Sequence, residues 1–204
     1  MARPSHLKLA PVAPEAEDGR RRRGQDNRAR IVAAMLEIIR EEDGCGGAPN
    51  AEQVAERADV GLRTVFRHFK DMDSLYREMS AEIELELRGV VELPLTAKDW
   101  RDRVLEMVAR RAVAFERIGP FKRAADTVRH RSRFLANDGM RLVEGLRELL
   151  LKELPKDVAG DPIAVETLDL LMSWESWSRL RWEQGLKPDQ ARGVLEAAVR
   201  KVID

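Results

Sequence analysis

Polar side chains that can contact nucleic acid lie close together in one short segment. Residues 62–70 contain Arg63, Thr64, Arg67, His68 and Lys70 and no acidic residue. Arg63 and Arg67 are four residues apart, so on a helix they share a face and are suited to guanine edges or phosphates. Thr64 can touch a phosphate or a thymine methyl group, and His68 and Lys70 suit the phosphate backbone. The segment predicts a helix that binds in a groove of duplex DNA.

The preceding residues predict the other half of a helix-turn-helix. Asn50 and Gln53 form a capping-box pattern at the start of a short helix, whose apolar positions are Val54, Ala55 and Ala58. Gly61 is expected to supply the backbone freedom for the turn, so that a bulky side chain there should loosen the unit. At about 100° per residue, the packing face of the second helix contains Leu62, Val65, Phe66 and Phe69.

The same cations also fit the solvated face of an ordinary surface helix. Three features favour a DNA contact: the turn spacing, the absence of acids from the second helix, and a basic segment upstream that could follow phosphates. This upstream segment contains Arg20, Arg21, Arg22, Arg23, Arg28 and Arg30.

The stretch from Val60 to Leu75 resembles the N-terminal DNA-binding domain of the TetR family of bacterial transcriptional regulators. The resemblance rests on Phe66, Arg67, His68, Phe69 and Leu75. Phe66 stands where Tyr is usual and lacks its hydroxyl. Met72 stands where a phosphate-binding Lys is usual, and Lys70 could take part of that role. The predicted DNA-binding residues are Asn50, Arg63, Thr64, Phe66, Arg67, His68 and Lys70.

The resemblance extends over roughly residues 26 to 80, and it implies a sequence-specific transcriptional regulator. Such a protein is expected to be a repressor that binds a palindromic operator as a homodimer, and that a small-molecule effector releases. A helical adaptor or scaffold without DNA binding is the alternative. The two differ because duplex binding should weaken steeply with salt.

Composition narrows the function further. The 204 residues include 36 basic and 36 acidic side chains, so the net charge is zero and DNA binding must depend on local charge. One cysteine, Cys45, allows no internal disulfide, and three scattered histidines suggest no metal site. No nucleophile elbow, Walker loop or dinucleotide fingerprint is present, so we expect neither an enzyme nor a cofactor. Without an apolar run of about 20 residues, the protein is expected to be cytoplasmic with no membrane partner.

Helical periodicity and the absence of hairpin signals predict an all-α fold of about nine helices. The expected organisation is a mobile basic arm over 1–24, a helix-turn-helix domain over 25–72 and an effector-binding and dimerisation domain over 73–204. The arm could be an expression scar or a DNA-wrapping tail. Helices are expected to start at Asp26 or Asn27 and at Asp73 or Ser74, and one is expected to stop at Gly119-Pro120.

The segment 162–184 is apolar on two sides, which predicts one long helix that faces both its own core and a second subunit. Val165, Leu168 and Met172 form one stripe, which we assign to the core. The predicted dimer interface, shared with a last helix that starts at Pro188, contains Leu170, Leu171, Trp174, Trp177, Leu180, Val194, Leu195 and Ala198.

Adaptable apolar side chains in the C-terminal part could line an effector cavity, beside one cation that could orient an anionic group. The candidate residues are Met107, Arg111, Phe115, Phe134, Met140, Trp174 and Trp177. Aromatic residues at helical spacing equally fit a plain core or subunit contact, and Arg111 equally fits a solvated position. The identity of the effector does not follow from the sequence. A basic run at Arg129, His130, Arg131 and Arg133 fits a solvated helix junction better than a second nucleic-acid surface.

Overall fold

The computed structural model describes residues 14–91 and 93–204, which form ten α-helices and one π-helical turn and contain no strand. The fold is therefore all-α, as predicted. In order, the elements are α1 (Pro14–Glu41), α2 (Ala51–Arg57), α3 (Leu62–His68), α4 (Met72–Val91), α5 (Trp100–Val128), α6 (Arg133–Glu153), α7 (Lys156–Ala159), α8 (Pro162–Leu171), α9 (Trp174–Ser178), η1 (Arg179–Glu183) and α10 (Pro188–Ile203).

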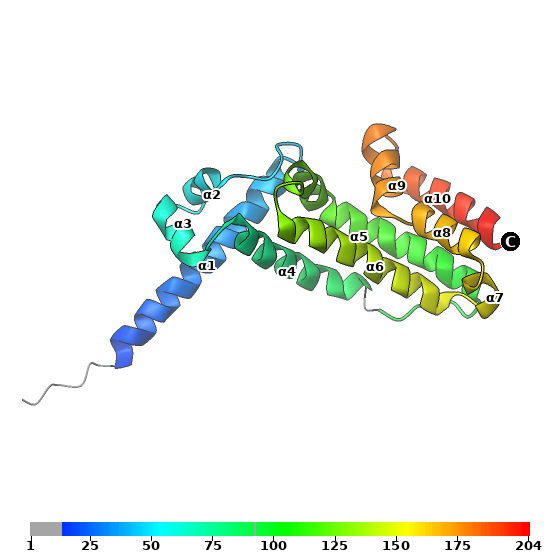
Figure 1. Cartoon of the computed structure of the whole chain (residues 1–204), viewed down its shortest axis with the longest axis horizontal. Coiled ribbons are helices and arrows are strands. Elements are labelled where there is room, and N and C mark those ends of the chain that lie inside the picture. Colours follow the sequence, from blue (N-terminus) through cyan, green and yellow to red (C-terminus); the bar gives the residue numbers. More distant parts are fainter. Residues whose placement is uncertain (1–13, 92) are drawn as a thin grey trace, which may run out of the picture.

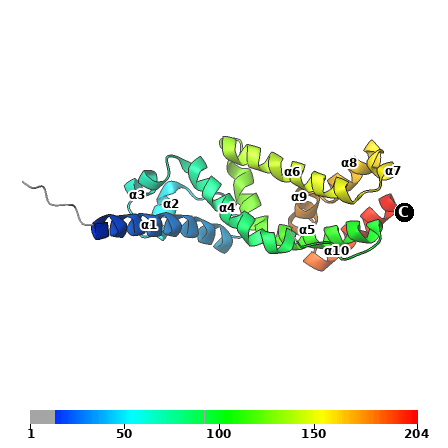
Figure 2. The same cartoon turned by 90° about the horizontal axis from the view of Figure 1, so that it is seen from below.

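The molecule is elongated, with α2 and α3 near one end and α8 and α10 near the other (Figures 1 and 2). We call helices α1–α3 the head and helices α4–α10 the body. None of the helices in the described part has the length and hydropathy needed to cross a bilayer.

The head forms because α1 offers one continuous apolar face to the two short helices. Ile31, Met35, Ile38 and Ile39 are buried at helical spacing, as the sequence predicted. The predicted capping box is also confirmed, since Asn50 Oδ1 accepts from the Gln53 amide and Gln53 Oε1 accepts from the Asn50 amide, both at 2.9 Å. These bonds satisfy two backbone donors that the start of α2 would leave free.

Helix α1 begins twelve residues earlier than the Asp26 start suggested by the sequence. It starts at Pro14, so residues 14–24 of the predicted mobile arm are helical, whereas residues 1–13 lie outside the described chain. Proline is favoured in the first turn of a helix because its missing amide has no partner to lose there.

The turn between α2 and α3 does not use Gly61 as expected. The residue with a left-handed backbone is Asp59, with φ of 50°, whereas Gly61 precedes α3 with φ of −70° and open space around its Cα. Short Asp side chains tolerate the left-handed region better than most. The expectation that a side chain at Gly61 would loosen the head is therefore wrong.

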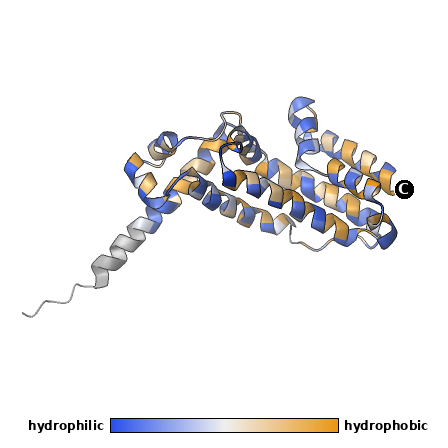
Figure 3. Cartoon of the chain, in the orientation of Figure 1, coloured by the Kyte–Doolittle hydropathy of each residue, from blue (hydrophilic) through white to orange (hydrophobic). Residues whose placement is uncertain are grey.

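Two hydrophobic clusters fill the interior. The boundary between them does not coincide with residue 72, where the sequence analysis ended the helix-turn-helix domain. The first joins the head to Leu75 and Met79 of α4, to Phe121 of α5 and to Leu135 of α6. The second packs α5 against α9 and α10 and also contains Val165 and Leu168 of α8. Figure 3 shows apolar and polar residues alternating along the helices, the pattern expected when each helix buries one face.

Two helix ends were placed wrongly from sequence. Helix α5 continues through Pro120 to Val128, although Pro120 cannot donate to the carbonyl of Glu116. The residues just beyond the proline, Phe121 and Ala124, are buried in the first cluster, so tertiary packing outweighs the lost bond.

The segment 162–184 is not one helix. It breaks at Met172 and Ser173, where the Ser173 hydroxyl caps α9 by accepting from the Ser176 amide at 3.2 Å. Helix α4 also begins slightly early, at Met72, because Asp71 and Ser74 bond each other's amides.

Glycine 44 should be essential to the join between head and body. Its φ is 72°, and a Cβ there would lie 2.2 Å from the Pro120 carbonyl oxygen. We expect Gly44→Ala to lower the free energy of unfolding by at least about 2 kcal/mol in urea titrations. Gly61→Ala is the matched control and should cost less than about 1 kcal/mol. Equal losses in the two variants would contradict the packing described.

Candidate nucleic-acid surface and effector cavity

Helix α3 presents a cationic surface to solvent. Arg63 and Arg67 are both exposed on it, Lys70 is exposed just beyond its end, and Thr64 is half-buried. On the opposite side, Val65 and Phe69 are buried in the first cluster. The predicted condition, two arginines one turn apart on an accessible face backed by an apolar face, is met. Asn50 is also exposed, with its side chain engaged in the capping box.

Two arginines of α1 hold this surface in place, and neither is free to follow phosphates as predicted. Arg28 donates to the His68 carbonyl at 2.8 Å, bonds Glu78 at 2.7 Å and lies over the Phe69 ring. Arg30 donates to the Ala58 carbonyl at 2.5 Å. Each cation satisfies a carbonyl at the C-terminal end of a short helix, where the helix dipole favours positive charge.

The packing face of α3 is narrower than predicted. Phe66 is 48% exposed, and Leu62 is also exposed beside Arg63. The helix is only seven residues long and packs on α1 and α2 through Val65 and Phe69. Its other apolar side chains therefore stay exposed. Phe66 is therefore exposed on the same helix as Arg63 and Arg67. It belongs to the set of residues for which the family resemblance implies DNA binding.

His68 does not face outwards with them. Its Nε2 is buried without a hydrogen-bond partner among the described residues, and its ring lies near Gly24 of α1. Burial lowers the pKa of His68, and the charges of Arg67 and Arg28 lower it further. Because Nε2 points inwards, this nitrogen is poorly placed to contact a phosphate, and the predicted role of His68 at the DNA backbone stays a prediction.

The body contains a mainly apolar cavity of about 240 Å³ between α4, α5 and α6. Of the residues proposed from sequence for an effector cavity, Met107, Phe115 and Arg111 of α5 line it together. The remaining lining residues are Leu87, Leu93, Pro94, Leu95, Arg110, Ala114, Ile118, Leu142, Leu146, Leu149 and Glu153.

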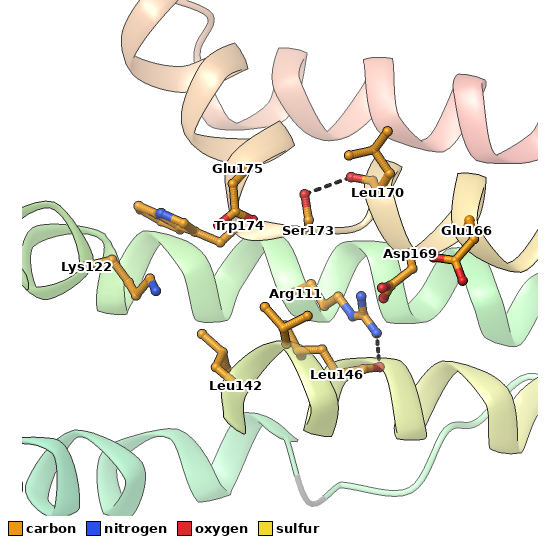
Figure 4. A pocket seen from close by; sticks show the side chains of 11 residues that line it. Arg111, Lys122, Leu142, Leu146, Glu166, Asp169, Leu170, Ser173, Trp174 and Glu175 are labelled. Atoms are coloured by element: carbon orange, nitrogen blue, oxygen red, sulfur yellow. Dashed lines mark hydrogen bonds between the residues drawn. The ribbon is translucent and has the colours of Figure 1, made fainter. Parts of the chain in front are cut away.

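A second cavity, of about 330 Å³, shares Arg111, Leu142 and Leu146 with the first as a common wall (Figure 4). Trp174 lines this second cavity, as do acidic residues of α8. Arg111 is only 6% exposed and donates to the carbonyls of Met172 at 3.0 Å and of Leu146 at 2.5 Å. It is therefore buried, not solvated.

Three predicted cavity residues lie elsewhere. Trp177 is fully buried, and its indole donates to Glu116 at 3.0 Å. Phe134 packs on the first cluster between the cations of Arg77 and Arg141. Met140 is exposed on α6 and lines a separate hollow between α5 and α6. A helical wheel could not exclude them because it contains no information about which neighbouring helix covers each face.

The predicted dimer residues separate into buried and accessible groups. Trp174, Trp177 and Leu195 are in the protein's own core, so they are not available on its surface. Leu170 is 64% exposed and Val194 is exposed, and Leu171, Leu180 and Ala198 are half-buried. The sequence analysis missed Ile163, which is 79% exposed one α8 heptad before Leu170 and shares its face.

A continuous series of contacts links the cavity wall to the head. Phe115 meets Trp174 edge-on with ring centres 5.9 Å apart, and Trp174 lies 5.5 Å from Trp182. Arg123 stacks on Trp182 at 4.0 Å, donates to the Asp43 carbonyl and pairs with the Asp43 carboxylate at 2.6 Å. Asp43 belongs to the loop that joins α1 to α2, so body and head are bonded directly.

Sequence reasoning also missed the α6 residues that complete the cavities. Leu142, Leu146 and Leu149 follow helical spacing and so share one face of a helix. That face would have been assigned to the cavity only with the knowledge that α6 packs on α5 and α8.

Comparison of the sequence with models of known protein families gives no match, and no curated protein matches it.

An ion pair fastens the segment at the cavity mouth. Glu106 accepts from the amides of Thr96 and Ala97 at 2.8 and 3.2 Å and bonds Arg110 at 2.5 Å. Arg110 in turn donates to the carbonyls of Leu93 and Pro94. The Thr96 amide, with help from Ala97 and Arg110, lowers the pKa of Glu106 to about 2.

These bonds predict an acid-dependent loss of stability. The folded pKa of Glu106 is below its usual value of about 4.3, so the contribution is complete above that value and is lost as pH falls toward about 2. We expect Glu106→Gln to be less stable at pH 7 and to lose this part of the dependence. Urea titrations from pH 7 to pH 2 would show it. The exposed Glu144→Gln is the control, and a parallel pH profile for Glu106→Gln and the unmodified protein would contradict the assignment.

Proposed function

We propose that the protein is a TetR-like, sequence-specific DNA-binding transcriptional regulator. The observation that supports this best is the exposed pair Arg63 and Arg67 on α3, a helix fixed from behind by Val65 and Phe69. A rigid support matters because base contacts require a helix held at a defined depth in the groove. The arginines can then bond guanine edges or phosphates, with Phe66 available for apolar contact with a thymine methyl group.

The regulator is proposed to act as a homodimer. Ile163 and Leu170 of α8 and Val194 of α10 are large apolar side chains exposed on two helices that pack together. Burying such a surface against a second copy would remove apolar area from water. A two-fold axis through it would present two copies of α3 to inverted half-sites, which is how a palindromic operator is bound.

The proposed activity is repression, relieved when a small molecule occupies the body. The cavity between α4, α5 and α6 is a concave, mainly apolar site with few charged groups, as ligand sites usually are. The contacts from Phe115 through Trp174, Trp182 and Arg123 to Asp43 offer a physical route by which an occupant could bias the head. Release follows if the occupant binds more tightly to a dimer whose heads do not match the half-site spacing.

A helical adaptor without DNA binding is the second candidate, because the body alone would suit it. The exposed cations of α3 favour the regulator. Anisotropy titration of labelled fragments from the protein's own upstream DNA, at two salt concentrations, separates the two. A regulator should lose affinity steeply as salt rises, whereas an adaptor should bind no fragment.

Substitutions in α3 should separate base recognition from phosphate binding. We expect Arg63→Ala to cost about 1 to 3 kcal/mol and to relax base preference, whereas Lys70→Ala should weaken all sequences alike and reduce the salt slope by about one. The exposed Arg117→Ala on α5 removes the same charge far from α3 and serves as control. An Arg63→Ala variant with unchanged affinity and preference would show that α3 is wrongly oriented.

Charge on the exposed apolar face should break the dimer. We expect Leu170→Arg, alone or with Ile163→Arg, to convert a dimer into a monomer of 23.2 kDa in light-scattering chromatography, because an unpaired charge in an apolar contact is costly. Leu85→Arg, at a leucine of α4 that is 52% exposed, should leave the dimer intact. If the Leu170→Arg variant and the double variant with Ile163→Arg both stayed dimeric, the interface would have to lie elsewhere.

A further inference from the structure

The charged groups that line the cavity between α4, α5 and α6 are unequally compensated. Arg110 pairs with Glu106 at 2.5 Å, and Glu153 pairs with Arg103 at 2.7 Å. Arg111, by contrast, makes no ion pair with any described residue, although it is only 6% exposed. Arg111 is therefore a positive charge without a direct ion-pair partner at the wall of a mainly apolar cavity, and Asp169 in the neighbouring cavity compensates it only in part.

Arg111 also retains hydrogen-bonding capacity. Its two bonds to the carbonyls of Leu146 and Met172 use two of the five N–H groups of a guanidinium. Desolvation lowers the pKa of Arg111 to about 10, and the charge of Asp169 opposes this only in part. The side chain is still protonated at neutral pH, so it keeps its charge and three N–H groups that bond no other described residue.

We propose that this cavity binds an apolar monoanion, a medium-chain carboxylate, with the carboxylate at Arg111 and the chain among the leucines of α4 and α6. The inference rests on the proposed function for the idea that the cavity receives an effector. A carboxylate matches the planar guanidinium and would supply the missing negative charge. A neutral ligand could accept a hydrogen bond but would leave the positive charge of Arg111 unpaired, and a cation would be repelled.

The apolar lining sets the rest of the ligand. Leu87, Met107, Phe115 and Leu149 approach from three helices, and the adjoining groove between the same helices adds about 490 Å³ lined by Met79, Ile83 and other residues. An extended chain can therefore continue from one space into the other. Each buried methylene contributes about 0.8 kcal/mol, so affinity should rise with chain length.

Calorimetric titration of the full chain tests the assignment without DNA. Octanoate, decanoate, decanol and decyltrimethylammonium are the probes, each kept below its micelle concentration. We expect decanoate to bind at least about tenfold tighter than decanol, about tenfold tighter than octanoate, and far tighter than the cation. Decanol binding as tightly as decanoate, or no binding of decanoate, would overturn the proposal.

Variants locate the site. Arg111→Met removes the charge at similar length and should reduce the preference for decanoate over decanol to within about twofold, whereas the exposed Arg117→Met should leave it unchanged. Because Arg111→Met removes two internal bonds and could unfold the body, Ala114→Leu provides a second test. Ala114 is a buried lining residue, and the larger side chain should weaken decanoate more than octanoate.

The outcomes distinguish this inference from the proposed function. Folded Arg111→Met that keeps the full preference, or Ala114→Leu that binds both chains normally, overturns the carboxylate site. Binding of duplex DNA together with no binding of decanoate overturns the inference and leaves the regulator. Decanoate binding without any duplex binding supports the site and overturns the regulator.

Discussion

The continuity of helix α5 through Pro120 determines how the head is held. Beyond the proline, Phe121 and Ala124 enter the cluster that contains the head, whereas the residues before it pack against α8 to α10. At the same point the loop after α1 closes on α5, where Gly44 approaches the Pro120 carbonyl and Arg123 bonds Asp43. One rigid element therefore fixes both the orientation of α3 and the wall of the cavities, which makes the two ends of the molecule mechanically dependent on each other.

The features that could be predicted from sequence are those determined within a few residues. The capping box of Asn50 and Gln53 and the buried stripe of α1 depend on local spacing, and both are present. The end expected at Gly119-Pro120 followed an equally local rule, but that rule was outweighed by packing against α1 and α4, which come much earlier in the chain. The prediction for the turn before α3 was wrong for a different reason. The turn needs one residue with a left-handed backbone, and Asp59 adopts it instead of Gly61.

The same distinction applies to the sites. Exposure of Arg63 and Arg67 follows from the periodicity of α3, so it could be expected. The roles of Arg28 and Arg30 could not, because a long side chain reveals its acceptor only when the fold brings together carbonyls about 30 to 40 residues away. Trp174 and Trp177 were assigned to a subunit contact because the segment is apolar on two sides. The break at Ser173 rotates α9 away from the direction of α8, and both indoles turn inwards.

The bond from Arg111 to the Met172 carbonyl has a consequence for how the protein would respond to its surroundings. Met172 ends α8, the helix whose outer face carries Ile163 and Leu170. If that face joins two subunits and the cavity binds a ligand at Arg111, the guanidinium is one hydrogen bond away from the helix that forms the subunit contact. Occupancy and assembly would then be linked equilibria, so the ligand concentration at half-saturation would shift with the number of protein molecules in the cell.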